Sequence, residues 1–229
     1  MAYCNTSLLG TYEKNEATVG AGGAVYIKST SQGIGCTYEG GPGMWYGSGA
    51  VKLIRNTAKT DGGGIYIEES WGTGIAGVTA NNNTAGGNGG AIYLNGYVPY
   101  FQNSEFTENK AANGGALYIT DYIDSNMEPI FNEELWYADT WEEVSTKILF
   151  QNNEATSNGG AVYSTHSINV KGTVMDGNSA TKGGAIYNSK SINVLSSQAK
   201  ASSITNNTAN QGVRRAEPHV HERRRGHQA

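Results

Sequence analysis

The sequence predicts an all-β chain folded as a right-handed parallel β-helix with about 25 residues per coil. Three observations support this prediction. Two glycines, a small residue, an aliphatic residue and a tyrosine recur as one motif, an asparagine stands about ten residues before each motif tyrosine, and hydrophobic and polar residues alternate around the motif. The motif begins at Gly22, Gly62, Gly89, Gly114, Gly159 and Gly183.

The spacing of the motif sets the length of the repeat. Successive motif tyrosines lie 40, 27, 25, 45 and 24 residues apart. These intervals indicate a base period of about 25 residues, interrupted by insertions at about 30–47 and 121–143. Leucine-rich repeats have similar periods but need several leucines in each repeat, and this chain has few. We therefore expect one β-helical repeat domain over residues 1–212, followed by a basic, disordered tail over 213–229.

Each coil is expected to contain three strands. In the first, the aliphatic residue before the tyrosine and the residue after the tyrosine share a face toward the core, so the tyrosine points outward. A second strand follows, clearest at 167–170 and 191–194, and a third precedes the asparagine, as in 172–178. Equivalent strands of successive coils would stack in parallel, about 4.8 Å apart.

The asparagines in register predict a hydrogen-bonded ladder along the axis of the stack. An asparagine side chain can accept and donate at once, so identical residues in neighbouring coils can bond to one another. The expected members are Asn15, Asn56, Asn83, Asn109, Asn153, Asn178 and Asn207. The alternative is that asparagine occurs here only because it suits turns. The fixed offset from the glycine pair favours the ladder.

Composition excludes several classes of protein. The chain has 229 residues, a net charge of −4, 32 glycines and 14 tyrosines. No run of about 18 apolar residues could span a membrane as a helix, and the first residues do not form a signal peptide. The repeat begins almost at once, which predicts a fragment of a longer β-helix whose open ends would associate end to end.

The tail and the two cysteines leave alternatives open. Residues 213–229 hold five of the six arginines and could contact nucleic acid or anionic lipid. The abrupt change of composition instead favours a shifted reading frame or a truncated product, so no nucleic-acid partner is expected. Cys4 and Cys36 could form a disulfide or remain free.

No cofactor or metal site is expected. Residues 86–91 approach a glycine-rich calcium repeat but lack its aspartate. Pectin-lyase-like β-helices include polysaccharide lyases and hydrolases, whose chemistry needs clustered carboxylates or a basic proton acceptor. Outside one insertion the aspartates of the repeat are scattered, and Arg55 is its only arginine. We therefore expect no enzyme and keep a carbohydrate-active enzyme, or a structural or non-functional gene fragment, as alternatives.

The insertion at 121–143 is unlike the rest of the chain. It contains eight acidic residues, no basic residue and five aromatic residues. Segments that leave a solenoid often carry recognition, and exposed aromatic side chains can anchor a protein or stack on a sugar. The candidate binding residues are Trp136, Tyr137, Trp141 and Glu142. The alternative is a short helix over 131–141 whose aromatic side chains pack back on the solenoid. Met44, Trp45 and Tyr46 in the smaller insertion are a weaker candidate of the same kind.

Two tetrapeptides together carry a resemblance to a known family. Gly-Gly-Ala-aliphatic occurs five times, beginning at Gly22, Gly89, Gly114, Gly159 and Gly183. Phe-x-x-Asn occurs at 106–109 and 150–153, with degenerate forms at 12–15, 53–56 and 175–178. Over about residues 12–212 this pairing resembles the chlamydial polymorphic outer membrane proteins.

The resemblance implies a fold, a location and a role. It implies the passenger β-helix of an autotransporter, which is secreted or displayed at the cell surface or outer membrane and acts as an adhesin. The expected partner is a host-cell protein or glycan. Attachment to the membrane would use a barrel domain that this chain lacks. We therefore expect a fragment of a surface-exposed binding scaffold.

Overall fold

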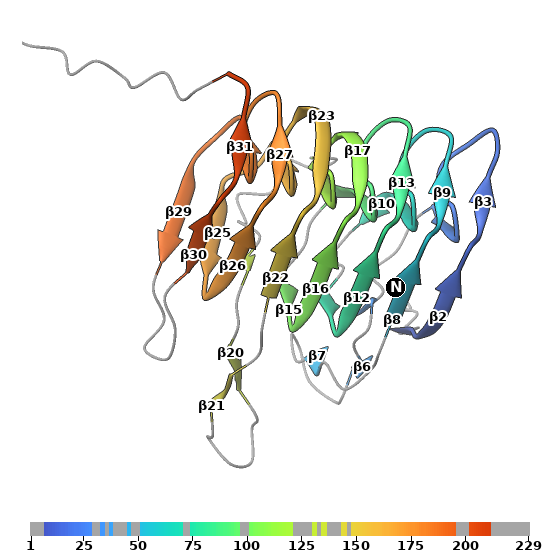
Figure 1. Cartoon of the computed structure of the whole chain (residues 1–229). Helices are drawn as coiled ribbons and strands as arrows, with labels where there is room; N and C mark the ends of the chain where they lie inside the picture. The colour runs from blue at the N-terminus through green and yellow to red at the C-terminus, as the bar shows by residue number, and fades with distance from the viewer. Residues whose placement is uncertain are drawn as a thin grey trace, which may run out of the picture.

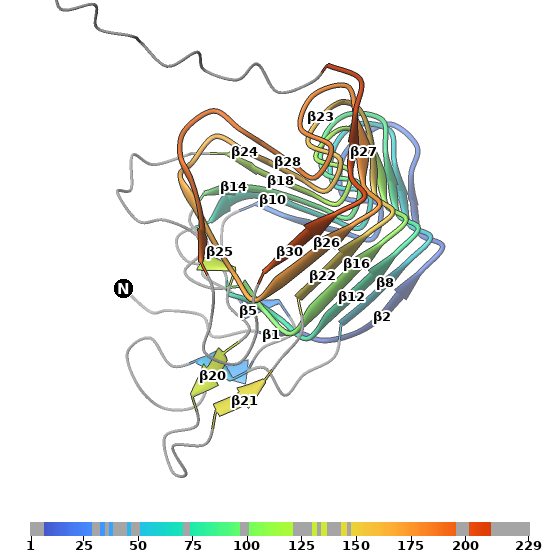
Figure 2. The same cartoon turned by 60° about the vertical axis from the view of Figure 1, so that its left-hand side comes forward.

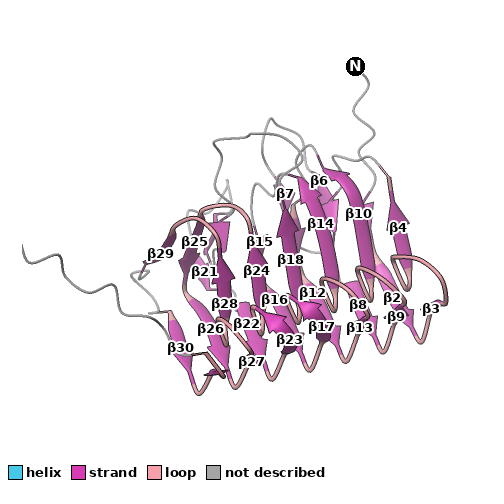
Figure 3. Ribbon diagram, turned by 90° about the horizontal axis from the view of Figure 1, so that it is seen from above, coloured by secondary structure: helices cyan, strands magenta, loops and turns pink. Residues whose placement is uncertain are grey.

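The computed structural model describes residues 7–28, 33–34, 37–38, 45–46, 51–70, 74–96, 101–120, 130–131, 134–136, 143–145, 148–195 and 202–211. It confirms the predicted fold. Strands of successive coils stack in parallel and form a β-helix (Figures 1 and 3). The described residues contain only strands and connections, so they include no helix that is long and apolar enough to cross a membrane.

Four stacked sheets form the sides of each coil, and the chain visits them in the order A, B, C, D. Sheet A contains β1 (Ser7–Leu8), β5 (Gly33–Ile34), β11 (Ile75–Ala76), β15 (Phe101–Gln102), β19 (Ile130–Phe131), β25 (Ile168–Lys171) and β29 (Ile192–Leu195). Sheet B contains β2 (Gly10–Glu13), β8 (Val51–Ile54), β12 (Val78–Asn81), β16 (Ser104–Thr107), β22 (Ile148–Gln151), β26 (Thr173–Asp176) and β30 (Ser203–Thr205). Sheet C contains β3 (Glu16–Ala17), β9 (Thr57–Ala58), β13 (Thr84–Ala85), β17 (Lys110–Asn113), β23 (Glu154–Asn158), β27 (Ser179–Ala180) and β31 (Thr208–Ala209). Sheet D contains β4 (Val25–Ile27), β10 (Ile65–Ser70), β14 (Ile92–Gly96), β18 (Leu117–Thr120), β24 (Val162–Ser164) and β28 (Ile186–Asn188).

The three strands expected in each coil lie in sheets D, A and B. The motif strand is sheet D, the strands expected at 167–170 and 191–194 are β25 and β29, and the strand expected within 172–178 is β26. Sheet C is an additional side. Most of its strands have two residues, directly after the ladder asparagine, and so are too short to show an alternation in the sequence.

Register in sheet D explains the repeat of the motif. Tyr66 lies opposite Tyr26 on one side and Tyr93 on the other, and the flanking aliphatic residues pair in the same way. Ile65 and Ile67 are fully buried, as the alternation predicts for core-facing residues. Phe106 and Phe150 stack in the core with ring centroids 5.2 Å apart. Each coil therefore buries its apolar face against copies of itself.

The glycine pair forms the corner between sheets C and D. Gly114 has φ of 60°, a backbone conformation that favours glycine. Gly115 lies directly against the next coil, where a Cβ atom would overlap the carbonyl oxygens of Glu154 and Gly160. The same crowding recurs at the second glycine of the other pairs. Close approach of successive coils is therefore the physical reason for the repeated glycine pair.

Two residues, the second an asparagine, connect sheet B to sheet C in every coil. The first of the two has a positive φ, for example 54° at Arg55, 57° at Glu108 and 66° at Gly177. This conformation costs an ordinary L-residue about 1–2 kcal/mol. The cost is offset because this turn places its second residue, the asparagine, inside the stack.

The last described coil leaves core-facing side chains uncovered. Val194 is 53% exposed, whereas its neighbour in sheet A, Val170, is fully buried. Ile204 is 43% exposed, whereas Met175 beside it is fully buried. End-to-end association stays a prediction. The tail at 213–229, Cys4 and Cys36 lie outside the described residues, so the structure does not test the expectations for them.

Candidate binding surface

The corner between sheets A and B is the connection whose length varies most between coils. In four coils a single residue makes this connection: Leu9, Gly77, Asn103 and Gly172. In the second coil the connection instead contains β6 (Thr37–Tyr38) and β7 (Trp45–Tyr46), and in the fifth it contains β20 (Glu134–Trp136) and β21 (Glu143–Ser145). Each pair of strands is antiparallel. Both hairpins thus leave the β-helix at the A–B corner (Figure 2).

The hairpins are separated by three coils. Parallel strands of a sheet lie about 4.8 Å apart, so their points of departure are about 14 Å apart along the axis. That separation is within the footprint of one protein partner or of a short oligosaccharide. The corner therefore offers two neighbouring extensions to a single partner.

The structure places only some of the candidate binding residues. Trp136 is the last residue of β20, where its backbone lies opposite Glu143. Tyr137, Trp141 and Glu142 lie outside the described residues. The helix considered for 131–141 is wrong at Glu134–Trp136, because these residues form a strand. In the smaller hairpin Trp45 lies opposite Tyr38, so both hairpins carry tryptophan within their strands.

The predicted asparagine ladder runs inside the stack at the connection between sheets B and C. Each asparagine except the last gives its backbone N–H and its Nδ2 to the Oδ1 of the asparagine in the following coil, with donor–acceptor distances of 2.8–3.0 Å. Nδ2 also donates to a backbone carbonyl one coil back, as Asn109 does to Ala80. Five members are fully buried: Asn56, Asn83, Asn109, Asn153 and Asn178. The ladder is continuous from Asn15 to Asn207, which confirms the prediction.

A second polar ladder was not predicted. Asn158 donates to Asn113, Asn113 to Asn88, and Asn88 to the carboxylate of Asp61, at 2.8–2.9 Å between Nδ2 and Oδ1. Each member directly precedes a glycine pair, for example Asn88 before Gly89. The polar residue directly before the glycine pair was therefore the feature of the sequence that could have predicted this second ladder.

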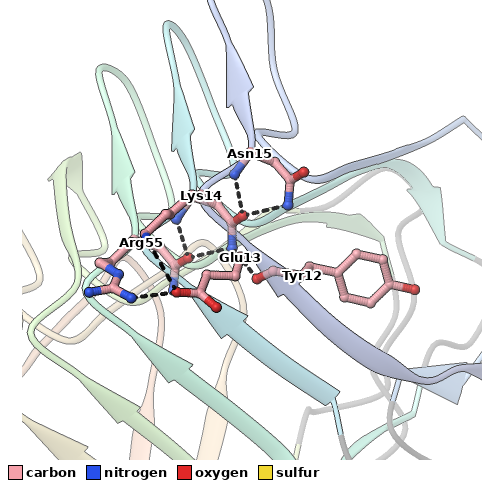
Figure 4. Close-up of polar contacts among 7 residues, drawn as sticks. Tyr12, Glu13, Lys14, Asn15 and Arg55 are labelled. Atoms are coloured by element: carbon pink, nitrogen blue, oxygen red, sulfur yellow. Dashed lines mark hydrogen bonds and ion pairs between the residues drawn. The ribbon is translucent and has the colours of Figure 1, made fainter.

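The residues weighed for catalysis are engaged in structural contacts. Arg55 forms an ion pair with Glu13 of the preceding coil, close to the first rung of the asparagine ladder at Asn15 (Figure 4). Asp176 accepts hydrogen bonds from Asn206 and Thr205, which hold the pKa of its carboxyl below the usual value. The described residues include no group of three or more histidine, cysteine or acidic side chains that could hold a metal ion.

A tyrosine ladder covers the outside of sheet D. Its rings stack in sequence with centroids 4.5–5.2 Å apart and interplanar angles of 5–23°. The members are Tyr26, Tyr66, Tyr93, Tyr118, Tyr163 and Tyr187. A hydrogen bond to Glu68 raises the pKa of Tyr26 to about 12, and burial raises the pKa of Tyr118 to about 12. The phenols of Tyr26 and Tyr118 therefore keep their protons to a higher pH than an ordinary tyrosine.

These pKa values predict a loss of stability in alkali. An unfolded tyrosine ionises near pH 10, whereas Tyr26 and Tyr118 hold their protons to about pH 12 in the folded chain. The folded state then binds more protons, so the free energy of unfolding falls as pH rises from about 10 to about 12. Urea unfolding at a series of pH values measures this slope, and Tyr118→Phe should make it shallower. Full phenolate absorbance at pH 10 in a chain that is still folded would contradict the prediction.

The chain carries the repeat of a known protein family. The Chlamydia polymorphic membrane protein repeat matches residues 103–120, 147–165 and 172–189. This finding confirms the resemblance seen in the sequence. Each match runs from the A–B corner through sheets B, C and D of one coil and ends before sheet A. No curated protein and no solved structure matches the chain.

Proposed function

We propose, from the premise that this chain carries the repeats of the Chlamydia polymorphic membrane proteins, that it is a surface-exposed β-helical scaffold that binds a host-cell protein or glycan. The name of the family supports placement at a membrane surface. Binding takes place at the A–B corner, through the two hairpins. The stacked sheets hold these hairpins at a fixed separation.

One observation carries this proposal. Sheets B, C and D and the corners between them have nearly the same path in every described coil, and the matched repeats cover these strands. The A–B corner instead varies from one residue to a hairpin. A connection of variable length beside strands of nearly constant path is typical of recognition loops on a rigid scaffold. Binding at this corner can therefore change without cost to the stack.

The proposal assigns no enzymatic activity to the chain. Arg55 and Asp176 have partners in neighbouring coils, and Asp61 accepts two hydrogen bonds from Asn88. Their positions are explained by the ladders and by contacts between coils. Incubation with acidic polysaccharides should accordingly release no reducing or unsaturated ends.

Aromatic side chains of the larger hairpin are expected to carry most of the affinity. Replacing Trp136 and Trp141 together with alanine should weaken attachment to host cells, or to an arrayed glycan, by at least about 2 kcal/mol, which is some thirtyfold in Kd. The measurement is attachment of the purified, labelled chain as a function of its concentration. Trp45→Ala should weaken attachment less.

The control must separate binding from folding. Val19 is 83% exposed, far from the A–B corner, in the connection between β3 and β4, so Val19→Ala should change neither property. The unfolding midpoint of the double tryptophan variant should match that of the native chain. Unchanged attachment of this variant would remove the larger hairpin from the proposal.

A further inference from the structure

The tyrosine ladder suggests a chemical role beyond packing. Each interior ring has a neighbour on both faces, so a flat ligand or a sugar cannot stack along the length of the ladder. The packing instead places six oxidisable rings in continuous contact, with centroids no more than 5.2 Å apart. Electrons transfer readily between redox-active rings in contact, so an oxidised ring can be refilled by its neighbour.

The two ends of the ladder differ. Tyr26, at the first coil, is 52% exposed, and its hydroxyl donates a hydrogen bond of 2.8 Å to Oε2 of Glu68. This distance is suitable for direct proton transfer. A tyrosine that loses an electron also loses its phenolic proton. Glu68 can accept the proton of Tyr26 through the existing hydrogen bond.

We propose that the tyrosine ladder is a one-electron relay that delivers oxidising equivalents to Tyr26, where they form a dityrosine cross-link to a second copy of this chain. The oxidant is a small diffusing radical of the carbonate or nitrogen dioxide class. It can react at any accessible ring of the ladder. The relay then determines where the product forms.

One oxidant removes one electron from a ladder tyrosine and is reduced to its anion, while the phenolic proton leaves. Each hop moves an electron and a proton from the next tyrosine to the phenoxyl radical, until the radical is on Tyr66. In the last hop Tyr26 gives its electron to Tyr66 and its phenolic proton to Glu68, while Tyr66 takes up a proton from solvent and Glu68 later releases its proton to solvent. Two such Tyr26 radicals, one on each copy, join their ortho carbons. The ring hydrogens on those carbons move to the phenolic oxygens, so each cross-link consumes two oxidants and releases two protons.

A hydrogen-bonded proton acceptor and exposure to solvent favour Tyr26 as the end point. The phenol of Tyr26 donates a hydrogen bond to the carboxylate of Glu68, which can accept its proton. Its exposure lets the radical meet the same residue of a second copy, whereas the interior rings are half-buried.

The experiment places the oxidant at the far end of the ladder. A ruthenium polypyridyl complex is attached through Ser189→Cys, beside Tyr187, in a full-length chain that also carries Cys4→Ser and Cys36→Ser. Flash photolysis with a cobalt(III) electron acceptor then generates ruthenium(III) on the protein. We expect a covalent dimer in which peptide mapping by mass spectrometry locates the dityrosine at Tyr26 of both copies.

Four variants make this test specific. Tyr26→Phe should abolish the mapped cross-link, and Tyr93→Phe should remove most of it, because phenylalanine keeps the stack but has no phenol to oxidise. Glu68→Gln should slow radical formation at Tyr26 about tenfold or more, since an amide does not accept the proton. Tyr12→Phe, outside the ladder, should change nothing. Circular dichroism and unfolding midpoints establish that each variant is folded.

Three results would overturn the proposal. Cross-links confined to Tyr187 would show that the oxidising equivalent does not travel. An unchanged yield in Tyr93→Phe would show that it reaches Tyr26 without the ladder. A cross-link between Tyr26 and Tyr66 of one chain would rule out the second copy as the partner.

Discussion

Replacing Asn109 with alanine is expected to lower the free energy of unfolding by about 4 kcal/mol. Oδ1 of Asn109 accepts two hydrogen bonds from Asn83, and its Nδ2 donates to Ala80 and to Asn153. All four are lost in the variant. The partners stay buried without full hydrogen bonding, and each buried polar group left without a partner costs about 1–3 kcal/mol. Urea unfolding followed by circular dichroism measures the change.

A matched control is available one strand away. Asn81 is half-buried, and its side chain donates one hydrogen bond of 2.8 Å to Thr107. Asn81→Ala should cost about 1 kcal/mol or less. If the two variants were equally stable, the ladder would not be a main source of stability in the stack.

Replacing Gly115 with alanine should be strongly destabilising, although it adds only one methyl group. The new Cβ atom would overlap the backbone oxygens of Glu154 and Gly160 in the next coil. The backbone of a stacked coil cannot shift without breaking its own hydrogen bonds to the neighbouring coils. We therefore expect the free energy of unfolding to fall by more than about 4 kcal/mol, or no folded protein. The unfolding midpoint and the yield of soluble protein measure this outcome.

Gly20→Ala is the control for the methyl group itself. A Cβ atom at Gly20 has no heavy atom within 4 Å, and its backbone is compatible with alanine. Its stability should stay within about 0.5 kcal/mol of the native chain. A mild effect at Gly115, comparable to that at Gly20, would mean that successive coils are not in close contact at the glycine corner.

Much of the scaffold could be predicted because its residues repeat in register. The offset between asparagine and the glycine pair predicted the ladder through Asn109, and the alternation around Tyr93 predicted which side chains are buried. Sheet C could not be predicted from alternation, because a strand such as Thr57–Ala58 is shorter than the pattern that would reveal it. The ion pair between Glu13 and Arg55 was missed for another reason. Glu13 and Arg55 are 42 residues apart, so only their place in successive coils brings them together.

The candidate binding surface was harder to predict than the scaffold. The aromatic and acidic composition of 121–143 identified the segment, but its residues follow no helical or strand period that would decide its structure. The hairpin at Glu134–Trp136 depends on pairing with Glu143–Ser145, which is a contact between positions and not a local preference. The two hairpins share one corner because each coil has four sides, and the sequence does not show where those sides begin and end.

Attachment by a chain that lacks the larger hairpin tests the central claim most directly. Residues 132–147 are replaced with a single glycine, which restores the one-residue connection found at Gly77 and Gly172. Attachment to host cells and the unfolding midpoint are measured on the same preparation. We predict that the midpoint stays close to that of the native chain while attachment is lost. A folded variant that still attaches with native affinity would contradict the assignment of binding to the A–B corner.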